Sequence, residues 1–291
     1  MAVSPAPVVI IGAARSGTNM LRDVLTSLPG FVTWPCDEIP YVWRHGNRAH
    51  PDDEFTRAMA TPAVRAGVGR AFARIGRAGG AVVEKTCANS LRVGFVDEAL
   101  PGARFVVITR HGMDAAASAM LRWRSSFDLR YSLAKARYVP AGDVPYYAAR
   151  YLGNRARRLL SRERRLAAWG PVFAGMRELP RDIPLAELAA RQWRRCVERT
   201  DEDLAGIAPA RVHRVRYEDF VGAPAAELAA LLAFLDAPVE PAAQAAAVAG
   251  VRAGSVGKAA RSLPAADQAI LARVCGPVLV RHGYGAPDPG P

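Results

Sequence analysis

The stretch that decides the fold reads VVIIGAARSGTN, from Val8 to Asn19. Its four consecutive apolar residues predict a short strand that is buried on both faces of a parallel sheet. Gly12 and Gly17 bracket the loop that follows, and a helix is expected from about Thr18 to Leu25. The N–H groups of such a loop and of the helix N-terminus converge on one point and favour an anion there. The sequence therefore predicts a strand–loop–helix unit that binds phosphate.

The side chains of this loop define what kind of phosphate ligand it suits. Arg15 can grip a phosphate oxygen with its guanidinium fork, and the hydroxyls of Ser16 and Thr18 can donate hydrogen bonds. Nucleotide triphosphatases carry a lysine at the position of Thr18, in the pattern G-x-x-x-x-G-K-[ST]. Its absence disfavours an ordinary ATPase or kinase and favours a nucleotide whose terminal group is not a γ-phosphate.

The rest of the chain alternates between strand and helix signals, which is typical of an α/β fold with a parallel sheet. Further strands are expected at 81–83, 104–109 and 212–215, and helices at 91–100, 113–121, 225–235 and 265–280. We expect a three-layer α/β domain with a mostly parallel central sheet, spanning residues 1–291. The region from about 122 to 200 is rich in arginine and aromatic residues, and it is expected to form a helical insertion that binds an acceptor.

A second anion site is predicted where the strand at 104–109 ends. Arg110 stands at that end, and Ser118 lies two turns into the following helix, so the pair can clamp another phosphate. Because ligands of open parallel sheets bind at the carboxyl ends of the strands, both sites are expected on one rim. Two separated phosphate grips suit a nucleotide that carries phosphates at both its 5′ and 3′ positions.

In order and spacing, these motifs resemble those of sulfotransferases that use 3′-phosphoadenosine 5′-phosphosulfate (PAPS). The run Arg15-Ser16-Gly17-Thr18 resembles the 5′-phosphosulfate loop of that family, and Arg110 with Ser118 resembles its 3′-phosphate motif. The segment from Glu84 to Asn89 resembles the one that carries a catalytic lysine, here Lys85. The resemblance covers residues 8–261, and it implies a P-loop-like fold related to nucleotide kinases.

Two later segments extend the resemblance. Tyr217-Glu218 resembles the family's late Tyr-Glu motif beside the nucleotide, and the loop with Ser255, Gly257 and Lys258 resembles the one that closes on the 3′-phosphate. The middle region matches through Gln192-Trp193. The resemblance implies that Arg15 and the Ser16–Asn19 loop hold the 5′-phosphate and that Tyr217 lies near the adenine.

The family's mechanism implies a role for Lys85 on the bridging oxygen of the leaving nucleotide, 3′,5′-diphosphoadenosine, with no metal required. The general base is left open. Many cytosolic relatives have a histidine two residues after the lysine, but this chain has Cys87. Glu84 is the choice by analogy with heparan-type enzymes, and Glu38 by analogy with tyrosylprotein sulfotransferases. If the strand continues through Lys85, Glu84 and Lys85 face opposite sides of the sheet.

Charge and composition leave three alternatives beside a sulfotransferase. The formal net charge of +12 and sequence pI of about 10.2 suit polyanionic ligands. A P-loop-type kinase, a basic binding protein and a catalytically inactive nucleotide-binding relative are the competing hypotheses. The chain has no recognisable nucleic-acid-binding motif, so the expected partner is a small-molecule, carbohydrate or peptide acceptor rather than nucleic acid.

The cysteines and the apolar runs bear on location. The four cysteines lie neither at metal-ligand spacing nor in a disulfide framework, and they are expected as free thiols of a reducing compartment. No apolar run approaches the roughly 20 residues of a membrane span, and no basic leader precedes the first strand. We expect a cytoplasmic protein without a bound metal or a membrane span.

Overall fold

A computed structural model describes residues 5–123, 137–149 and 169–285. Its centre is a five-stranded sheet in the order β2-β3-β1-β4-β5, and every neighbouring pair is parallel. The strands are β1 (Val8–Ile11), β2 (Phe31–Val32), β3 (Ala81–Lys85), β4 (Arg104–Thr109) and β5 (Val212–Arg216). The expectation of an α/β fold with a parallel central sheet is confirmed.

Helices cover both faces of this sheet because its central strands β1 and β4 are apolar on both sides. The α-helices that lie wholly within the described residues are α1 (Thr18–Thr26), α2 (Pro40–Trp43), α3 (Pro62–Gly76), α4 (Val93–Ala99), α5 (Gly112–Trp123), α8 (Leu185–Leu204), α9 (Tyr217–Gly222), α10 (Pro224–Phe234), α11 (Pro241–Val248), α12 (Lys258–Ser262) and α13 (Ala265–Arg281). Short 3₁₀ helices occupy Arg57–Met59, Cys87–Leu91, Ala141–Asp143, Met176–Glu178 and Pro209–Arg211.

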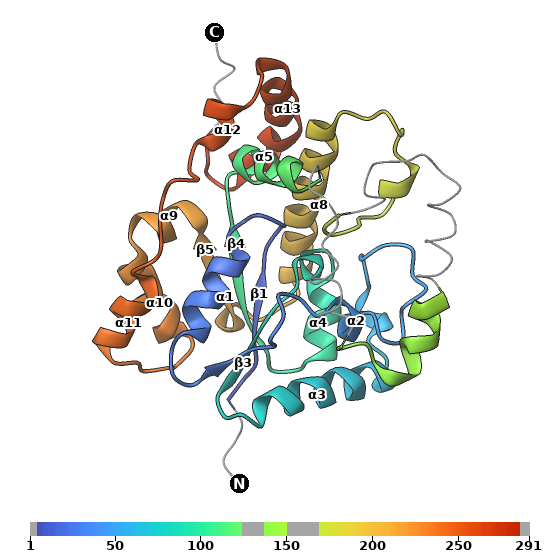
Figure 1. The fold of residues 1–291 in the computed structure, drawn as a ribbon, viewed down its shortest axis with the longest axis vertical. Coiled ribbons are helices and arrows are strands. Elements are labelled where there is room, and N and C mark those ends of the chain that lie inside the picture. The colour runs from blue at the N-terminus through green and yellow to red at the C-terminus, as the bar shows by residue number, and fades with distance from the viewer. Residues whose placement is uncertain (1–4, 124–136, 150–168, 286–291) are drawn as a thin grey trace.

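The alternation of side chains along β1 separates two hydrophobic cores. Val8 and Ile10 pack with α1, α9 and α10, whereas Val9 and Ile11 pack with α3 and α4 on the opposite face. Figure 1 shows α1 and α9 to α11 on one side of the strands and α4 on the other. The sheet and the two helical layers make the three layers that the sequence predicts.

A third core joins α5, α8 and α13. In Figure 1 these three helices lie together, with α12 beside α5 and α13. Trp193 of α8 packs against the start of α5, where a Cβ on Gly112 would lie only 2.7 Å from the indole ring. Of the expected insertion at 122–200, residues 124–136 and 150–168 lie outside the described residues.

Within the described ranges, no helix combines the length and the apolar character that crossing a membrane requires.

Candidate functional site

The phosphate loop predicted after the first strand is a tight turn that packs against the end of β4 and the start of α9. A Cβ on Gly12 would lie 2.7 Å from the carbonyl oxygen of Ile108 in β4. A Cβ on Gly17 would lie 2.5 Å from the ring of Tyr217, and Gly17 also has a φ of +92° as the N-cap of α1. Only glycine combines this close approach with left-handed backbone. The two glycines therefore bring the turn against the carboxyl ends of β4 and β5.

Arg15 joins the two predicted anion sites. Its Nε donates a hydrogen bond of 3.0 Å to Ser118 Oγ in α5, and its carbonyl oxygen accepts one of 3.0 Å from Nη1 of Arg110. Arg15 adopts a φ of +71°, which is uncommon for a residue with a side chain and is often found at functional sites. Partial burial and the nearby Arg122 guanidinium lower the pKa of Arg15. The site is therefore a concentrated patch of positive charge.

Buried polar atoms without a partner lie in the same place. Ser16 is 1% exposed and Arg110 6% exposed, and within the described part of the chain Ser16 Oγ and Arg110 Nε make no hydrogen bond. Asn19 Oδ1, in the first turn of α1, is also unpaired there. Buried polar groups are nearly always paired, so unpaired ones call for an explanation. Both Ser16 Oγ and Arg110 Nε can donate, and an oxyanion in this loop would satisfy them.

The predicted catalytic lysine lies beside one of the two candidate bases. Lys85 is the last residue of β3, and its Nζ is 3.1 Å from Oε1 of Glu38. The same carboxylate oxygen accepts a hydrogen bond of 3.2 Å from the backbone N–H of Cys87. The Cys87 thiol is 3.7 Å from the Thr18 hydroxyl at the start of α1. This contact connects the lysine segment to the phosphate loop.

Glu84, the other candidate base, has different partners. Strand β3 continues through Lys85, so Glu84 and Lys85 extend to opposite sides of the sheet. The Glu84 carboxylate is 1% exposed and accepts hydrogen bonds from Thr86 Oγ1 at 2.5 Å and Asn89 Nδ2 at 3.0 Å. Burial raises the pKa of Glu84 to about 7. Glu38 therefore pairs with Lys85, whereas Glu84 belongs to a separate network of buried polar side chains that includes Thr86 and Asn89.

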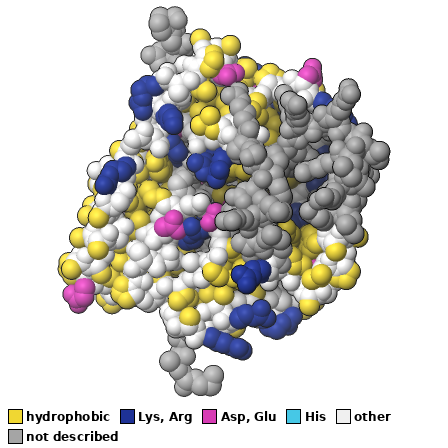
Figure 2. Space-filling view, in the orientation of Figure 1, with side chains coloured by type: hydrophobic (Ala, Val, Ile, Leu, Met, Phe, Trp, Pro, Cys, Tyr) yellow, Lys and Arg dark blue, Asp and Glu magenta, His cyan; other side chains and the backbone are white. Residues whose placement is uncertain are grey.

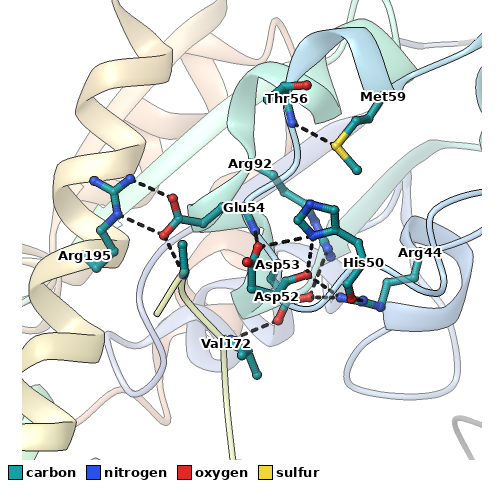
Figure 3. A network of polar contacts seen from close by, with 11 residues as sticks. Arg44, His50, Asp52, Asp53, Glu54, Thr56, Met59, Arg92, Val172 and Arg195 are labelled. Atoms are coloured by element: carbon teal, nitrogen blue, oxygen red, sulfur yellow. Dashed lines mark hydrogen bonds and ion pairs between the residues drawn. The ribbon is translucent and has the colours of Figure 1, made fainter. Parts of the chain in front are cut away.

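That network continues into a buried cluster of charges that the sequence motifs did not indicate. Asn89 Oδ1 accepts a hydrogen bond of 2.9 Å from the Nε of Arg92. Arg92 is fully buried, and its Nη1 lies 3.3 Å from Oδ1 of Asp53. Arg44 contacts the same carboxylate, with its Nη1 2.7 Å from Oδ1 of Asp53 (Figure 3). Asp53 also accepts a hydrogen bond of 2.9 Å from the backbone N–H of Val172. Burial lowers the pKa of Arg92 to about 10. The acidic run Asp52-Asp53-Glu54 was the available sequence signal.

Arg110 connects the phosphate loop to the late motifs. Its guanidinium carbon lies 4.5 Å from the centroid of the Tyr217 ring, in cation–π geometry, and its Nη2 donates 2.6 Å to the carbonyl oxygen of Ser255. Glu218 accepts 2.9 Å from the N–H of His111, and its other oxygen accepts 2.9 Å from the Tyr284 hydroxyl. The Tyr217-Glu218 motif therefore contacts both the Arg110 side chain and the backbone of the next residue, His111.

The C-terminal loop is tied to the start of α5 by a residue that sequence reasoning missed. Asp114 is 4% exposed, and its two carboxylate oxygens accept from the N–H groups of Gly257 and Ala259, each at 2.7 Å. Lys258 is exposed at the first position of α12. An acidic residue four positions after Arg110 was a usable signal, but a first-turn acid is ordinary in helices.

Lys and Arg side chains gather over α5 and α12 on the face shown in Figure 2. No cluster of three or more His, Cys, Asp or Glu side chains that could hold a metal occurs among residues 5–123, 137–149 and 169–285.

This chain belongs to the sulfotransferase family: the model of that family matches residues 7–166 and 154–241. The fold is similar to that of the sulfotransferase domain from the curacin biosynthetic pathway, with a TM-score of 0.50 and 16% sequence identity over 87% of this chain and 83% of that one. The sulfotransferase STF9 from Mycobacterium avium gives a TM-score of 0.52 at 15% identity, over 94% of this chain and 77% of that one. No curated protein matches the sequence.

Proposed function

We propose that this protein transfers a sulfuryl group from PAPS to a hydroxyl or amine acceptor by in-line displacement, as an enzyme of class 2.8.2. The observation that carries the proposal is the junction of the two anion motifs, in which Arg15 contacts Ser118 and Arg110 contacts Arg15. One ligand with phosphates at two positions could bind to both anion motifs. The unpaired donors of Ser16 and Arg110 support a doubly phosphorylated nucleotide rather than a single anion.

PAPS, when bound, supplies the activated sulfuryl group. We assign its 5′-phosphosulfate to the loop from Arg15 to Asn19. There the backbone N–H groups and the helix dipole at the start of α1 favour an anion. Its 3′-phosphate is assigned to Arg110 and Ser118, with Ser255, Gly257 and Lys258 on the closing side. The ring of Tyr217, which Arg110 covers on one face, is assigned to the border of the adenine.

Lys85 and Glu38 are assigned to the chemical step. As the acceptor oxygen bonds to sulfur and the bond from sulfur to the 5′-phosphate oxygen breaks, negative charge grows on that oxygen. The ammonium of Lys85 stabilises this charge, and the Glu38 carboxylate takes the proton of the acceptor. The pairing of these two side chains favours Glu38 over Glu84 as the base. Cys87 is a poor substitute for histidine because burial raises the pKa of its thiol to about 11.

The remaining assignments follow from the same site. We propose one catalytic domain over residues 1–291, in which the region from about 122 to 200 binds a small-molecule, carbohydrate or peptide acceptor. All four cysteines are free thiols. This state fits a reducing compartment, and we propose a cytoplasmic enzyme.

Calorimetric titration with 3′,5′-diphosphoadenosine, using 5′-AMP and ATP as controls, tests the donor. We expect tight binding that requires the 3′-phosphate; a preference for ATP would instead support the kinase hypothesis. Incubation with PAPS and a panel of hydroxyl and amine acceptors, read by mass spectrometry for a sulfated product, then separates an enzyme from an inactive relative. Binding without transfer to any acceptor would contradict the catalytic assignment.

A further inference from the structure

We infer that Asp114 is a positioning residue that fixes the C-terminal loop, residues 255–259, so that this loop completes the 3′-phosphate end of the donor site. The inference rests on the proposed function. It concerns a residue that contacts neither Lys85 nor Glu38 in the structure and to which the sequence motifs gave no role.

The contacts define a clamp between two segments of chain that are far apart in sequence. Asp114 accepts from both Gly257 and Ala259, so each carboxylate oxygen holds one backbone N–H. Four residues earlier, Arg110 donates 2.6 Å to the carbonyl oxygen of Ser255. Asp114 in the first turn of α5 and Arg110, two residues before that helix, therefore hold the loop at three of its five residues.

The chemistry of the clamp requires an aspartate. Hydrogen bonds to an ionised acceptor are about twice as strong as neutral ones, and Asp114 is buried, with 4% of the residue exposed. Asparagine would keep the shape but place an NH₂ group against a backbone N–H, so one of the two bonds would be lost. Gly257 has a φ of +66°, and its bond to Asp114 holds the turn into α12 in that conformation.

The clamp decides where Lys258 stands. This lysine lies between Gly257 and Ala259 and is exposed. Because both neighbours are bonded to Asp114, the backbone position of Lys258 is fixed and limits the positions that its ammonium can reach. Because Asp114 directs its charge to backbone N–H groups, the cations of Arg110 and Lys258 remain available to a phosphate. We expect the clamp to affect ligands that carry a 3′-phosphate and to leave those with a 5′-phosphate alone unaffected.

The test compares two nucleotides on the full chain. For Asp114→Asn we expect the affinity for 3′,5′-diphosphoadenosine to fall about tenfold, which is the loss typical of a charge-assisted hydrogen bond, while the 5′-AMP affinity stays within about twofold. Asp203→Asn is the matched control, because Asp203 also accepts from a backbone N–H, that of Gly94 at 2.8 Å, but does so between α8 and α4. That variant is expected to keep the nucleotide preference of the parent.

A double-mutant cycle with Lys258→Ala keeps the inference testable if Asp114→Asn loses stability. When Asp114 acts by positioning Lys258, removing the lysine costs affinity in the parent and little in the Asp114→Asn background. Additive effects, or equal losses for both nucleotides, would overturn the inference and leave the donor assignment intact. A parent protein that does not prefer the 3′-phosphate would refute the proposed donor itself and, with it, the role of Asp114.

Discussion

The Nζ of Lys85 lies 3.1 Å from Oε1 of Glu38, although 47 positions separate the two residues in the chain. The pair stands where β3 ends, beside the phosphate loop that follows β1. Strands β1 and β3 are parallel neighbours, so their carboxyl ends meet at one edge of the sheet. The proposed leaving-group cation and the proposed base are thereby brought together with the predicted anion site.

Replacing Lys85 by alanine tests the assignment of the leaving-group cation. We expect kcat to fall roughly 100-fold or more, because a preorganised charge at the developing oxyanion is lost. The affinity for 3′,5′-diphosphoadenosine, measured by calorimetry, should change little. Lys258→Ala is the contrasting variant, with weaker nucleotide binding and a kcat near that of the parent. Full activity of Lys85→Ala would remove the lysine from the mechanism.

The two glutamates can be separated with the same acceptor. Glu38→Gln is expected to lower kcat about 100-fold, since glutamine cannot take the acceptor proton. Glu84→Gln should keep most of the activity of the protein that remains folded, because its carboxylate is bonded to Thr86 and Asn89. Initial rates at saturating PAPS would measure both. The opposite order of the two effects would make Glu84 the base.

Glu84 is also expected to leave a signature in the pH dependence of stability. Its pKa is raised from 4.5 to about 7 in the folded state, so between these values the folded protein holds a proton that the unfolded chain has released. Its contribution to the free energy of unfolding is therefore complete below pH 4.5 and is lost as the pH rises to about 7. Urea unfolding at several pH values should show this decline in the parent.

The variant Glu84→Gln, which cannot titrate, is the control for that decline. The difference in free energy of unfolding between parent and variant should fall across the same pH window and be level above it. A difference that is constant with pH would mean that the Glu84 carboxyl titrates near its ordinary value.

The approach of Gly17 to Tyr217 can be measured against a second glycine. Gly17 and Gly30 have φ values of +92° and +85°, but a Cβ at Gly30 would meet nothing within 4 Å. Alanine at Gly30 is expected to cost about 1 kcal/mol for backbone strain, and alanine at Gly17 about 3 kcal/mol because a clash with Tyr217 is added. Thermal unfolding of both variants would measure the difference. Equal losses would show that the ring moves aside freely.

Local signals were sufficient for much of the fold. The apolar runs at 8–11 and 104–109 predicted β1 and β4, and the helices at 113–121 and 265–280 were found within two residues of α5 and α13. Helix α3 (Pro62–Gly76) was missed, although its buried residues Val64, Val68 and Phe72 recur at the four-residue spacing of a helix face. Strand β3 was expected to end at residue 83 but continues to Lys85, since its last two residues are polar yet buried.

By itself, the sequence determined the family, and it predicted the phosphate loop and the second anion motif. Each of these depends on residues close together in the chain, where glycine conformation, apolar periodicity and spacing act directly. The pairing of Lys85 with Glu38 rather than Glu84, the buried Arg92–Asp53 pair and the hold of Asp114 on the C-terminal loop were decided only by the tertiary structure. These contacts join residues 39 to 145 positions apart, and packing, which no local pattern encodes, brings them together.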